Sequence, residues 1–535
     1  MAAISRALVI FSAAAVTALA LAAPVFLLGQ VIGQWSFAER VLTEPATWRF
    51  LRSSVLLGVT VGLTTMLIGL AAAWLTVRLD LPRPWRLALT VLLCMPLIMP
   101  SYVAAFGLIV ATGPNGLLGP LLPEGFILRD FPFLAAWLVL SSCTYPYAFL
   151  AARAALLRQC GSLEDAAVGL GASRAKAFFR ITVPRIVPSL TWGGLLSGLY
   201  CLADFGAVSM IGYETMTWAI YNRYTSALAV EEARVLALIL AVVAVVVILI
   251  MRRVRPVPPS TSSATLQPQT PVRRHPLAIV PLALVLAAVV CGAFLPLASA
   301  VQLTAGGGSG DVVWVRTFAE ATSTLVLAVL AAVLVVVLTF PLTSLEFGRD
   351  RLAARWFAPL TMIGFALPGL VVAVAAVGIA LLIDQGIEWV FRLEPGRFLY
   401  QSSALLLFAY AAMFLPEAVG PMQAASNHVH PEQVDAGRQL DGRPWRVWRR
   451  VLLPQLTPGI VAGAALVFVT TAKELPATLL LAPPNVETLA TSIWSNMQEA
   501  ELVHAAHGAL WLVAICAAGL LVVFRMERRG HLTAE

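Results

Sequence analysis

Charged side chains are scarce in this sequence of 535 residues, because only 12% of them are Asp, Glu, Lys or Arg. Globular domains average about a quarter charged residues. Hydrophobic residues make up 59% of the chain, which leaves too few polar side chains to cover several soluble domains. An aromatic content of 9% also excludes a disordered chain. The composition therefore predicts a polytopic membrane protein.

Lysine is nearly absent, and its two positions, Lys176 and Lys473, both follow alanine. The chain thus has no G-x-x-x-x-G-K-[ST] phosphate-binding loop, so we expect no enzyme activity and no bound cofactor. Six cysteines lie mostly in apolar runs without C-x-x-C spacing, which indicates buried thiols and not a zinc site. The net charge of +8 comes largely from arginines in the stretches between the apolar runs, as in membrane proteins. We therefore expect no nucleic-acid partner.

Twelve apolar runs are long enough to cross a bilayer core of about 30 Å as helices. By number they are 7–29, 53–76, 87–112, 133–157, 188–212, 233–251, 277–301, 323–345, 357–382, 402–425, 458–481 and 505–525. With the N-terminus inside, 26 of the 36 basic residues fall in stretches predicted to be cytoplasmic and nine fall outside. This bias predicts a multi-pass protein with both termini in the cytoplasm.

A polar, proline-rich stretch, 256–276, separates the runs into two sets of six. Its composition predicts a flexible cytoplasmic linker between a first repeat, 1–255, and a second repeat, 277–535. Because six is an even number, both halves enter the membrane in the same direction. The expected fold is therefore all-α, with about twelve transmembrane helices in two parallel six-helix repeats.

An internal repeat, in which the two halves align at one constant offset without a gap, supports this division. It is clearest in a first loop, about 158–187, and a second loop, about 427–457. The aligned pairs are Pro146/Pro416, Asp165/Asp435, Ala166/Ala436, Pro184/Pro454, Pro188/Pro458 and Asp204/Glu474. So many matches at one offset indicate an ancient duplication or a fusion of two related subunits.

Each loop is predicted to carry a short helix with paired aromatic residues and arginines. In the first loop, residues 165–167 extend the fourth span, Gly171 permits a sharp turn, and a short helix covers 172–180 before Pro184 restarts the chain. In the second loop the short helix is 443–450, with Trp445 and Trp448 on one face. Such helices suit docking to a partner protein, or equally a position in the lipid interface.

The loops resemble the pattern E-A-A, three residues, G, nine residues, I-x-L-P of binding-protein-dependent ABC importer permeases. The first loop matches with Asp165, Ala166, Ala167, Gly171, Ile181, Val183 and Pro184. The second matches with Asp435, Ala436, Gly437, Val451, Leu453 and Pro454, whereas Asp441 stands in the place of the glycine and Gly442 follows one residue late. Stretches 203–208, 217–221, 473–478 and 487–494 resemble fused permeases of ferric-iron importers. Fused thiamine permeases are similar in length and layout.

This resemblance implies a type I ABC importer permease fold in a bacterial inner membrane, embedded in lipid. It also implies two copies of an ABC ATPase, which use ATP, and a periplasmic ferric-iron-binding protein. The residues expected to couple the chain to the ATPase are Asp165, Ala166, Gly171, Arg174, Phe178, Pro184, Asp435, Ala436, Gly442, Trp445, Trp448 and Pro454.

Acidic residues inside apolar runs are costly and usually face a cavity or a partner. Asp204 and Glu474 are therefore predicted either to line a gate of the transport path or to cap a break in a helix. His504, His507, Glu499 and Glu501 form a weak candidate site for iron, or simply begin a helix at the interface. A major-facilitator-type secondary transporter is a more distant alternative, but long duplicated loops have no purpose in that fold.

Overall fold

The computed structural model describes residues 2–158, 162–226, 229–254, 279–306, 311–346, 364, 367–392, 396, 398–427, 429–441 and 444–532. The regular elements in these ranges are all helices. Eleven of the described helices are long and apolar enough to cross a membrane, and one bent pair makes a possible twelfth span. The predicted all-α polytopic fold is therefore confirmed. The predicted linker, 256–276, lies outside the described residues.

The chain forms two compact units. The first-half unit comprises Glu44–Ala219 and Val242–Gly307. Its helices are α3 Pro45–Arg78, α4 Arg83–Cys94, α5 Ser101–Thr112, α6 Pro132–Leu157, α7 Ser162–Gly169, α8 Arg174–Ala177, α9 Val183–Ala203, α10 Gly206–Ile211, α13 Ile279–Val289 and α14 Leu295–Gly306. Two helices, α11 Met216–Ser226 and α12 Val230–Arg253, are divided between the units.

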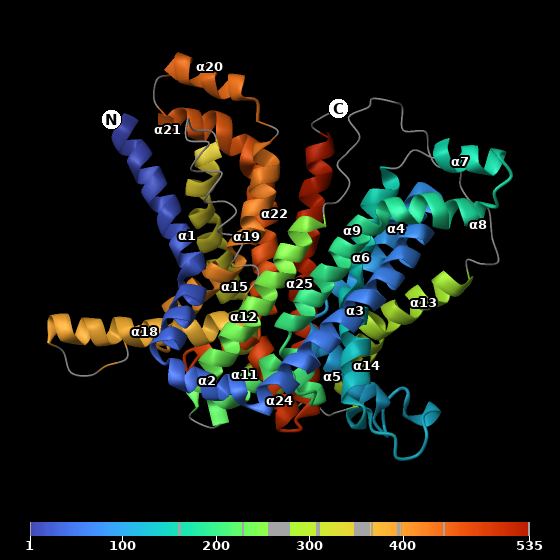
Figure 1. Cartoon of the computed structure of the whole chain (residues 1–535), viewed down its shortest axis with the longest axis horizontal. Coiled ribbons are helices and arrows are strands. Elements are labelled where there is room, and N and C mark those ends of the chain that lie inside the picture. The colour runs from blue at the N-terminus through green and yellow to red at the C-terminus, as the bar shows by residue number, and fades with distance from the viewer. Residues whose placement is uncertain are drawn as a thin grey trace. The chain divides into compact units, whose positions relative to one another are not determined.

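The second-half unit comprises Met1–Thr43, Ile220–Ala241 and Gly308–Glu535. Its helices are α1 Ala2–Gly33, α2 Trp35–Thr43, α15 Asp311–Glu346, α18 Gly369–Phe391, α19 Ser403–Ser426, α20 Pro431–Asp441, α21 Pro444–Val447, α22 Leu453–Ala472, α23 Pro476–Leu481, α24 Leu489–Gln498 and α25 Leu502–Leu532. In Figure 1, α18 runs across the direction of α1 and α22.

The first helix of each sequence half belongs to the unit built mainly from the other half. α1 packs against α15, α18 and α19, whereas α13 packs against α3 and α14 against α5. Each compact unit is therefore assembled from both sides of the linker.

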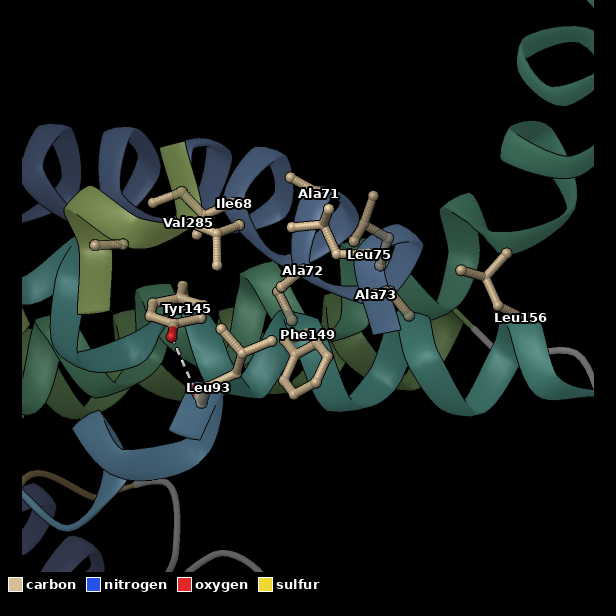
Figure 2. Close-up of a cluster of buried hydrophobic side chains, with 14 of the residues drawn as sticks. Ile68, Ala71, Ala72, Ala73, Leu75, Leu93, Tyr145, Phe149, Leu156 and Val285 are labelled. Atoms are coloured by element: carbon tan, nitrogen blue, oxygen red, sulfur yellow. Dashed lines mark hydrogen bonds between the residues drawn. The ribbon is translucent and has the colours of Figure 1, made fainter. Parts of the chain in front are cut away.

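Apolar side chains of α3, α4, α6, α9 and α13 form a core of the first-half unit. Figure 2 shows Ile68 and Leu75 of α3 facing Tyr145 and Phe149 of α6. The Tyr145 hydroxyl donates a 2.8 Å hydrogen bond to the carbonyl oxygen of Leu93, which satisfies the one polar group of this buried ring. The same cluster reaches Phe178 at the start of the chain segment that enters α9.

Four predicted spans are not seen as one continuous helix. In the ninth, 357–382, the helix α18 begins at Gly369, and residues 357–363, 365 and 366 lie outside the described residues. The third span, 87–112, is broken between α4 and α5 with a bend of 90°. Pro96 and Pro100 lie at this break, and proline both removes a backbone donor and disfavours helix at the residue before it. The fifth and eleventh spans end at Ala203 and Ala472, before the short helices α10 and α23.

Candidate functional site

The first loop contains one separate helix, α7, and one helix that leads into the membrane span. α8 continues through a π-helical turn, Phe178–Thr182, into α9, so the helix is unbroken from Arg174 to Ala203. A wider turn just before Pro184 accommodates a residue without a backbone N–H. The predictions that 172–180 is a free short helix and that Pro184 restarts the chain are therefore wrong. Residues 165–167 also lie in α7 and not in α6.

Gly171 makes the sharp turn that its position predicts. Its φ is +92°, in the left-handed region that favours glycine. The N–H of Gly171 donates to the carbonyl of Val168, and the N–H of Ala172 donates to the carbonyl of Ala167, both at 3.0 Å. This pair of bonds is a Schellman motif, which satisfies carbonyl groups at the end of α7.

A buried ion pair ties α7 to the rest of the first-half unit. Glu164 of α7 pairs with Arg78, the last residue of α3, whose side chain is only 4% exposed. The Thr182 hydroxyl donates a 2.9 Å hydrogen bond to the same carboxylate. The Arg78 guanidinium also lies 5.8 Å from the centre of the Phe178 ring. We call Arg78, Glu164 and Thr182 the polar lock.

The second loop repeats the helical pattern with a different turn. Its π-helical turn, Trp448–Leu452, occupies the positions aligned with that of the first loop and again precedes a proline, Pro454. α20, however, continues to Asp441, the residue aligned with Gly171. The helix of the second loop therefore does not turn at the position where the first loop turns at Gly171. Gly442 lies outside the described residues.

Apolar side chains replace the polar lock in the second loop. Val434 and Leu452 occupy the positions of Glu164 and Thr182, and both are buried. Together with Val429, Val447 and Leu456 they form a hydrophobic cluster, which we call the apolar lock. The Trp448 ring packs beside this cluster and makes an edge contact with Phe340 at 5.2 Å between centroids.

The predicted coupling residues differ in accessibility. Phe178 is buried, whereas its neighbour Phe179 is 64% exposed. Exposed positions among the described residues are Asp165, Ala166, Gly171, Arg174, Pro184, Ala436 and Pro454. Asp435 lies in α20 and Trp445 in α21, and Trp448 is half-buried.

Sequence reasoning missed two exposed leucines. Leu170 and Leu440 occupy aligned positions of the two repeats, and each follows the repeated acidic segment at the end of α7 or within α20. They are 90% and 89% exposed, among the most exposed large hydrophobic residues that the structure describes. The repeat offset alone was sufficient to pair them. The pairing of Arg78 with Glu164 had no such signal, because the residues are 86 positions apart.

Asp204 sits at the break after α9 and stabilises it. One carboxylate oxygen accepts a 3.0 Å hydrogen bond from the backbone N–H of Ala207, in the first turn of α10. The other accepts from the hydroxyl of Ser101, the first residue of α5. The backbone carbonyl of Asp204 accepts a 2.7 Å bond from Thr217. Both carboxylate oxygens therefore have partners within the protein.

Glu474 makes the corresponding contacts in the second-half unit. Its Oε1 accepts a 3.2 Å bond from the N–H of Ala477 in α23, and its carbonyl accepts a 2.7 Å bond from Thr478. Gly369 begins α18, as Ser101 begins α5, and a Cβ at Gly369 would collide with Glu474 Oε1. Glu474, the longer acid, thus lies against Gly369, whereas Asp204, the shorter acid, accepts a hydrogen bond from Ser101.

Of the weak candidate iron residues, the structure brings together His504 and Glu501, with 3.9 Å between Nδ1 and Oε2. His504 is buried, with Nε2 3.4 Å from Glu320 Oε1, whereas Nδ1 of His507 lies 2.9 Å from the carbonyl of Val503. Glu499 and Glu501 are exposed. Among the described residues, no group of three or more His, Cys, Asp or Glu side chains is placed to hold a metal ion.

Residues 66–256 and 342–529 each match the family described as the inner membrane component of binding-protein-dependent transport systems. The chain belongs to this family of permease subunits, and the two matches confirm the internal repeat. Family membership leaves no basis for the secondary-transporter alternative. It also agrees with a membrane protein that is not itself the ATPase.

Among its relatives, the chain is 26% identical to the Fe(3+)-transport system permease protein FbpB 2 of Haemophilus influenzae, over 88% of this chain and 89% of that protein. It is 34% identical to the Escherichia coli molybdenum transport system permease protein ModB, over 33% of this chain and 78% of that protein. Identity to the Escherichia coli sulfate transport system permease protein CysW is 32%, over 27% and 50% of the two chains.

Proposed function

We propose that this chain is the membrane permease of an ATP-driven importer of ferric iron. The support is the relative that matches it almost end to end, both repeats included, which is named for Fe(3+) transport. The molybdenum and sulfate relatives match only about a third of the chain. These two relatives leave oxyanions as alternative cargoes. The resemblance to fused thiamine permeases leaves thiamine as another.

The observation that carries the proposed coupling to an ATPase is the pair of exposed leucines, Leu170 and Leu440. An apolar side chain held almost fully in solvent at matched sites of two repeats suits insertion into an apolar pocket of a partner. We propose that each loop contacts one copy of an ABC ATPase, with α7 and α20 as the main contact elements. Exposed Phe179, and not buried Phe178, would then add to the first contact.

In this proposal both loops and both termini face the cytoplasm, and a periplasmic protein delivers the cargo to the opposite side. ATP is bound and hydrolysed by the partner. Asp204 and Glu474 contribute to the gate by fixing the helix breaks, because each carboxylate accepts a hydrogen bond from a backbone N–H of the short helix that follows it.

Stimulation of ATP hydrolysis tests the cargo. The chain and its ATPase are reconstituted in nanodiscs, and candidate binding proteins loaded with ferric iron, molybdate, sulfate or thiamine are added in turn. We expect the ferric protein to stimulate hydrolysis. Stimulation only by an oxyanion- or thiamine-loaded protein would refute the iron assignment and leave the permease assignment intact.

Leu170→Asp and Leu440→Asp test the coupling contact. Loss of an interface hot spot weakens binding by about thirtyfold, so each variant should bind the ATPase poorly and lose ATP-driven uptake. Leu121→Asp is the matched control, because Leu121 is 79% exposed in the same unit as Leu170 but outside the loops. Equal ATPase binding by Leu170→Asp and Leu121→Asp would contradict this contact.

A further inference from the structure

Glu417 is an acidic residue deep within a membrane span. It belongs to α19 and lies about 14 Å along the helix from the nearer end, Ser426. The residue is partly exposed on the second-half unit. A charged side chain at such a depth is costly in lipid, so it faces a water-filled cavity or another part of the protein. The exposed part of Glu417 is therefore turned toward the interior of the transporter and not toward lipid.

The neighbouring helix α22, which packs beside α19 (Figure 1), holds the Glu417 side chain. The hydroxyl of Thr470 donates a 2.6 Å hydrogen bond to Glu417 Oε2. The ammonium group of Lys473, one turn further along α22, and the carboxylate of Glu474 both act on the charge of Glu417. Thr470 and Lys473 are also partly exposed. In their ionised forms, two carboxylates and one ammonium group give this surface a net negative charge.

The two sides of α22 differ in polarity. On one side, Ala464 and Phe468 line an apolar groove with α15 and α25. Thr470 follows Phe468 by two residues and so lies about 200° around the helix axis, on the opposite side. On that side a Cβ at Gly463 would lie 3.0 Å from the Cα of Ala418 in α19. The polar residues therefore lie at the contact of α19 with α22, away from the apolar groove.

The first-half unit makes the corresponding helix contact with uncharged side chains. The aligned pairs are Tyr147/Glu417, Tyr200/Thr470 and Ala203/Lys473. The rings of Tyr147 and Tyr200, both partly exposed, have centroids 6.2 Å apart. Their helices, α6 and α9, pack against each other as α19 and α22 do. Uncharged side chains therefore suffice to join these helices, and packing alone gives no reason for a carboxylate at Glu417.

Charged side chains along a path select the sign of the ion that passes, and oxygen ligands suit hard cations. We propose that Glu417 lines the transport path in the second-half unit and favours a cationic cargo. Lys473 balances part of the negative charge, so a cation is attracted without being retained. This inference rests on the proposed function, because ferric iron is a cation whereas molybdate and sulfate are anions.

Labelling of introduced cysteines tests where the polar surface faces, whatever the cargo. Leu466→Cys places a thiol one turn before Thr470, at a residue that is 39% exposed. Phe468→Cys, on the side of the apolar groove, is the matched control. The full chain is assembled with its ATPase in nanodiscs and treated with charged methanethiosulfonate reagents that do not enter lipid, and the unsubstituted chain gives the background. We expect Leu466→Cys to react and Phe468→Cys to remain unlabelled. Equal reaction of the two, or none at Leu466→Cys, would overturn the assignment of this surface to the path.

A cationic and an anionic reagent of similar size test the charge at the same thiol. Removing one unit charge within a few ångströms changes a local concentration of ions by about fivefold. Adding Glu417→Gln to Leu466→Cys should lower the preference for the cationic reagent by that factor, whereas adding Lys473→Met should raise it. The amide oxygen of glutamine still accepts a hydrogen bond from Thr470, so the helix contact is kept. A preference that Glu417→Gln leaves unchanged, or that both variants shift in the same direction, would overturn the role of the charge.

Iron uptake tests the consequence for the cargo. Proteoliposomes with the full chain and its ATPase receive a binding protein loaded with ferric iron. Glu417→Gln should slow uptake at least about tenfold, because a trivalent cation interacts more strongly with a carboxylate than a monovalent reagent does. Glu39→Gln, at an exposed acid on α2 of the same unit, is the control, and ATPase binding by each variant reports an intact fold.

The possible failures are distinguishable. Equal iron uptake by Glu417→Gln and Glu39→Gln would overturn the selection of cations by Glu417 and leave the iron assignment intact. Uptake of molybdate and not of iron by the unsubstituted chain would refute the iron assignment and the cationic cargo together, whatever the labelling shows about the charge of this surface.

Discussion

The two loops hold their first helices with opposite chemistry at aligned positions. In the first loop, Glu164 of α7 is bound by Arg78 and Thr182. In the second, Val434 of α20 packs against Leu452 in a hydrophobic cluster. The π-helical turn before the proline is the same in both. The same loop geometry is therefore compatible with a polar or an apolar contact. Substitutions in the two contacts should lower the stability of the loop by different amounts.

The largest effect is expected from Glu164→Ala in the polar lock. Removing one partner of a buried ion pair leaves an uncompensated charge, which costs about 3–5 kcal/mol. The loss should appear as faster hydrogen exchange of the α7 amides, because the free energy of local opening falls by that amount. The amides of α20 should not change.

A triple variant separates charge from shape in the same lock. Arg78→Met, Glu164→Val and Thr182→Leu together give the first loop an apolar contact like that of the second. Replacing a buried ion pair with apolar side chains of similar volume is often neutral or stabilising, so α7 should regain its protection. If the triple variant is as unprotected as Glu164→Ala, the two locks are not interchangeable.

Val434→Ala in the apolar lock should have a smaller effect. It removes two buried carbon atoms and leaves a cavity, which costs about 2 kcal/mol. Hydrogen exchange of α20 is the measurement, and Gln433→Ala, an exposed position on the same helix, is the control. A loss of protection as large as that from Glu164→Ala would contradict the distinction between the locks.

Gly171→Ala tests the difference between the two turns. Alanine in the left-handed conformation costs about 1–2 kcal/mol, so the end of α7 should fray and its exchange should quicken. Gly169→Ala is the control, since a Cβ at either glycine would meet no atom within 4 Å and only Gly171 has a positive φ. Equal effects of the two substitutions would show that φ is not the cause.

Ser173→Ala should have the smallest effect. The Ser173 hydroxyl accepts a 3.2 Å hydrogen bond from the N–H of Lys176 and so caps α8. Loss of such a cap costs about 0.5–1 kcal/mol at an exposed helix start, measured as a small fall in the melting temperature of the purified chain. Ser173→Thr retains the acceptor and should restore the melting temperature. A full loss in the threonine variant would exclude the cap as the cause.

Features set by local sequence were predictable. Apolar runs predicted the spans, and the constant offset between the halves predicted that both loops share one pattern. The turn at Gly171 followed from the backbone freedom of glycine at that position. The apolar runs and the turn lie within a few residues of their signals, and the offset is read from the sequence itself, so no contact between distant residues had to be known.

Features set by distant partners were not predictable in this way. The contacts of Asp204 with Ser101, and of Glu164 with Arg78, join residues far apart in sequence. The continuous helix through Pro184 depends on a π-helical turn that has no periodic signature. The bend at Pro96 and Pro100 did have a local signal, but the apolar composition of 87–112 concealed it.

The first helix of each half packs in the unit formed mainly by the other half. This arrangement delays the assembly of the unit that contains α1 until late in synthesis. α1 leaves the ribosome first, yet its contact α15 begins only after the whole first half and the linker have been made. At common rates of translation this interval lasts roughly 15–60 s. During that time α1 lies in the membrane without α15, α18 and α19, which are still to be made. Neither half can complete its unit alone, so one continuous chain guarantees that each unit receives its missing helix in equal number.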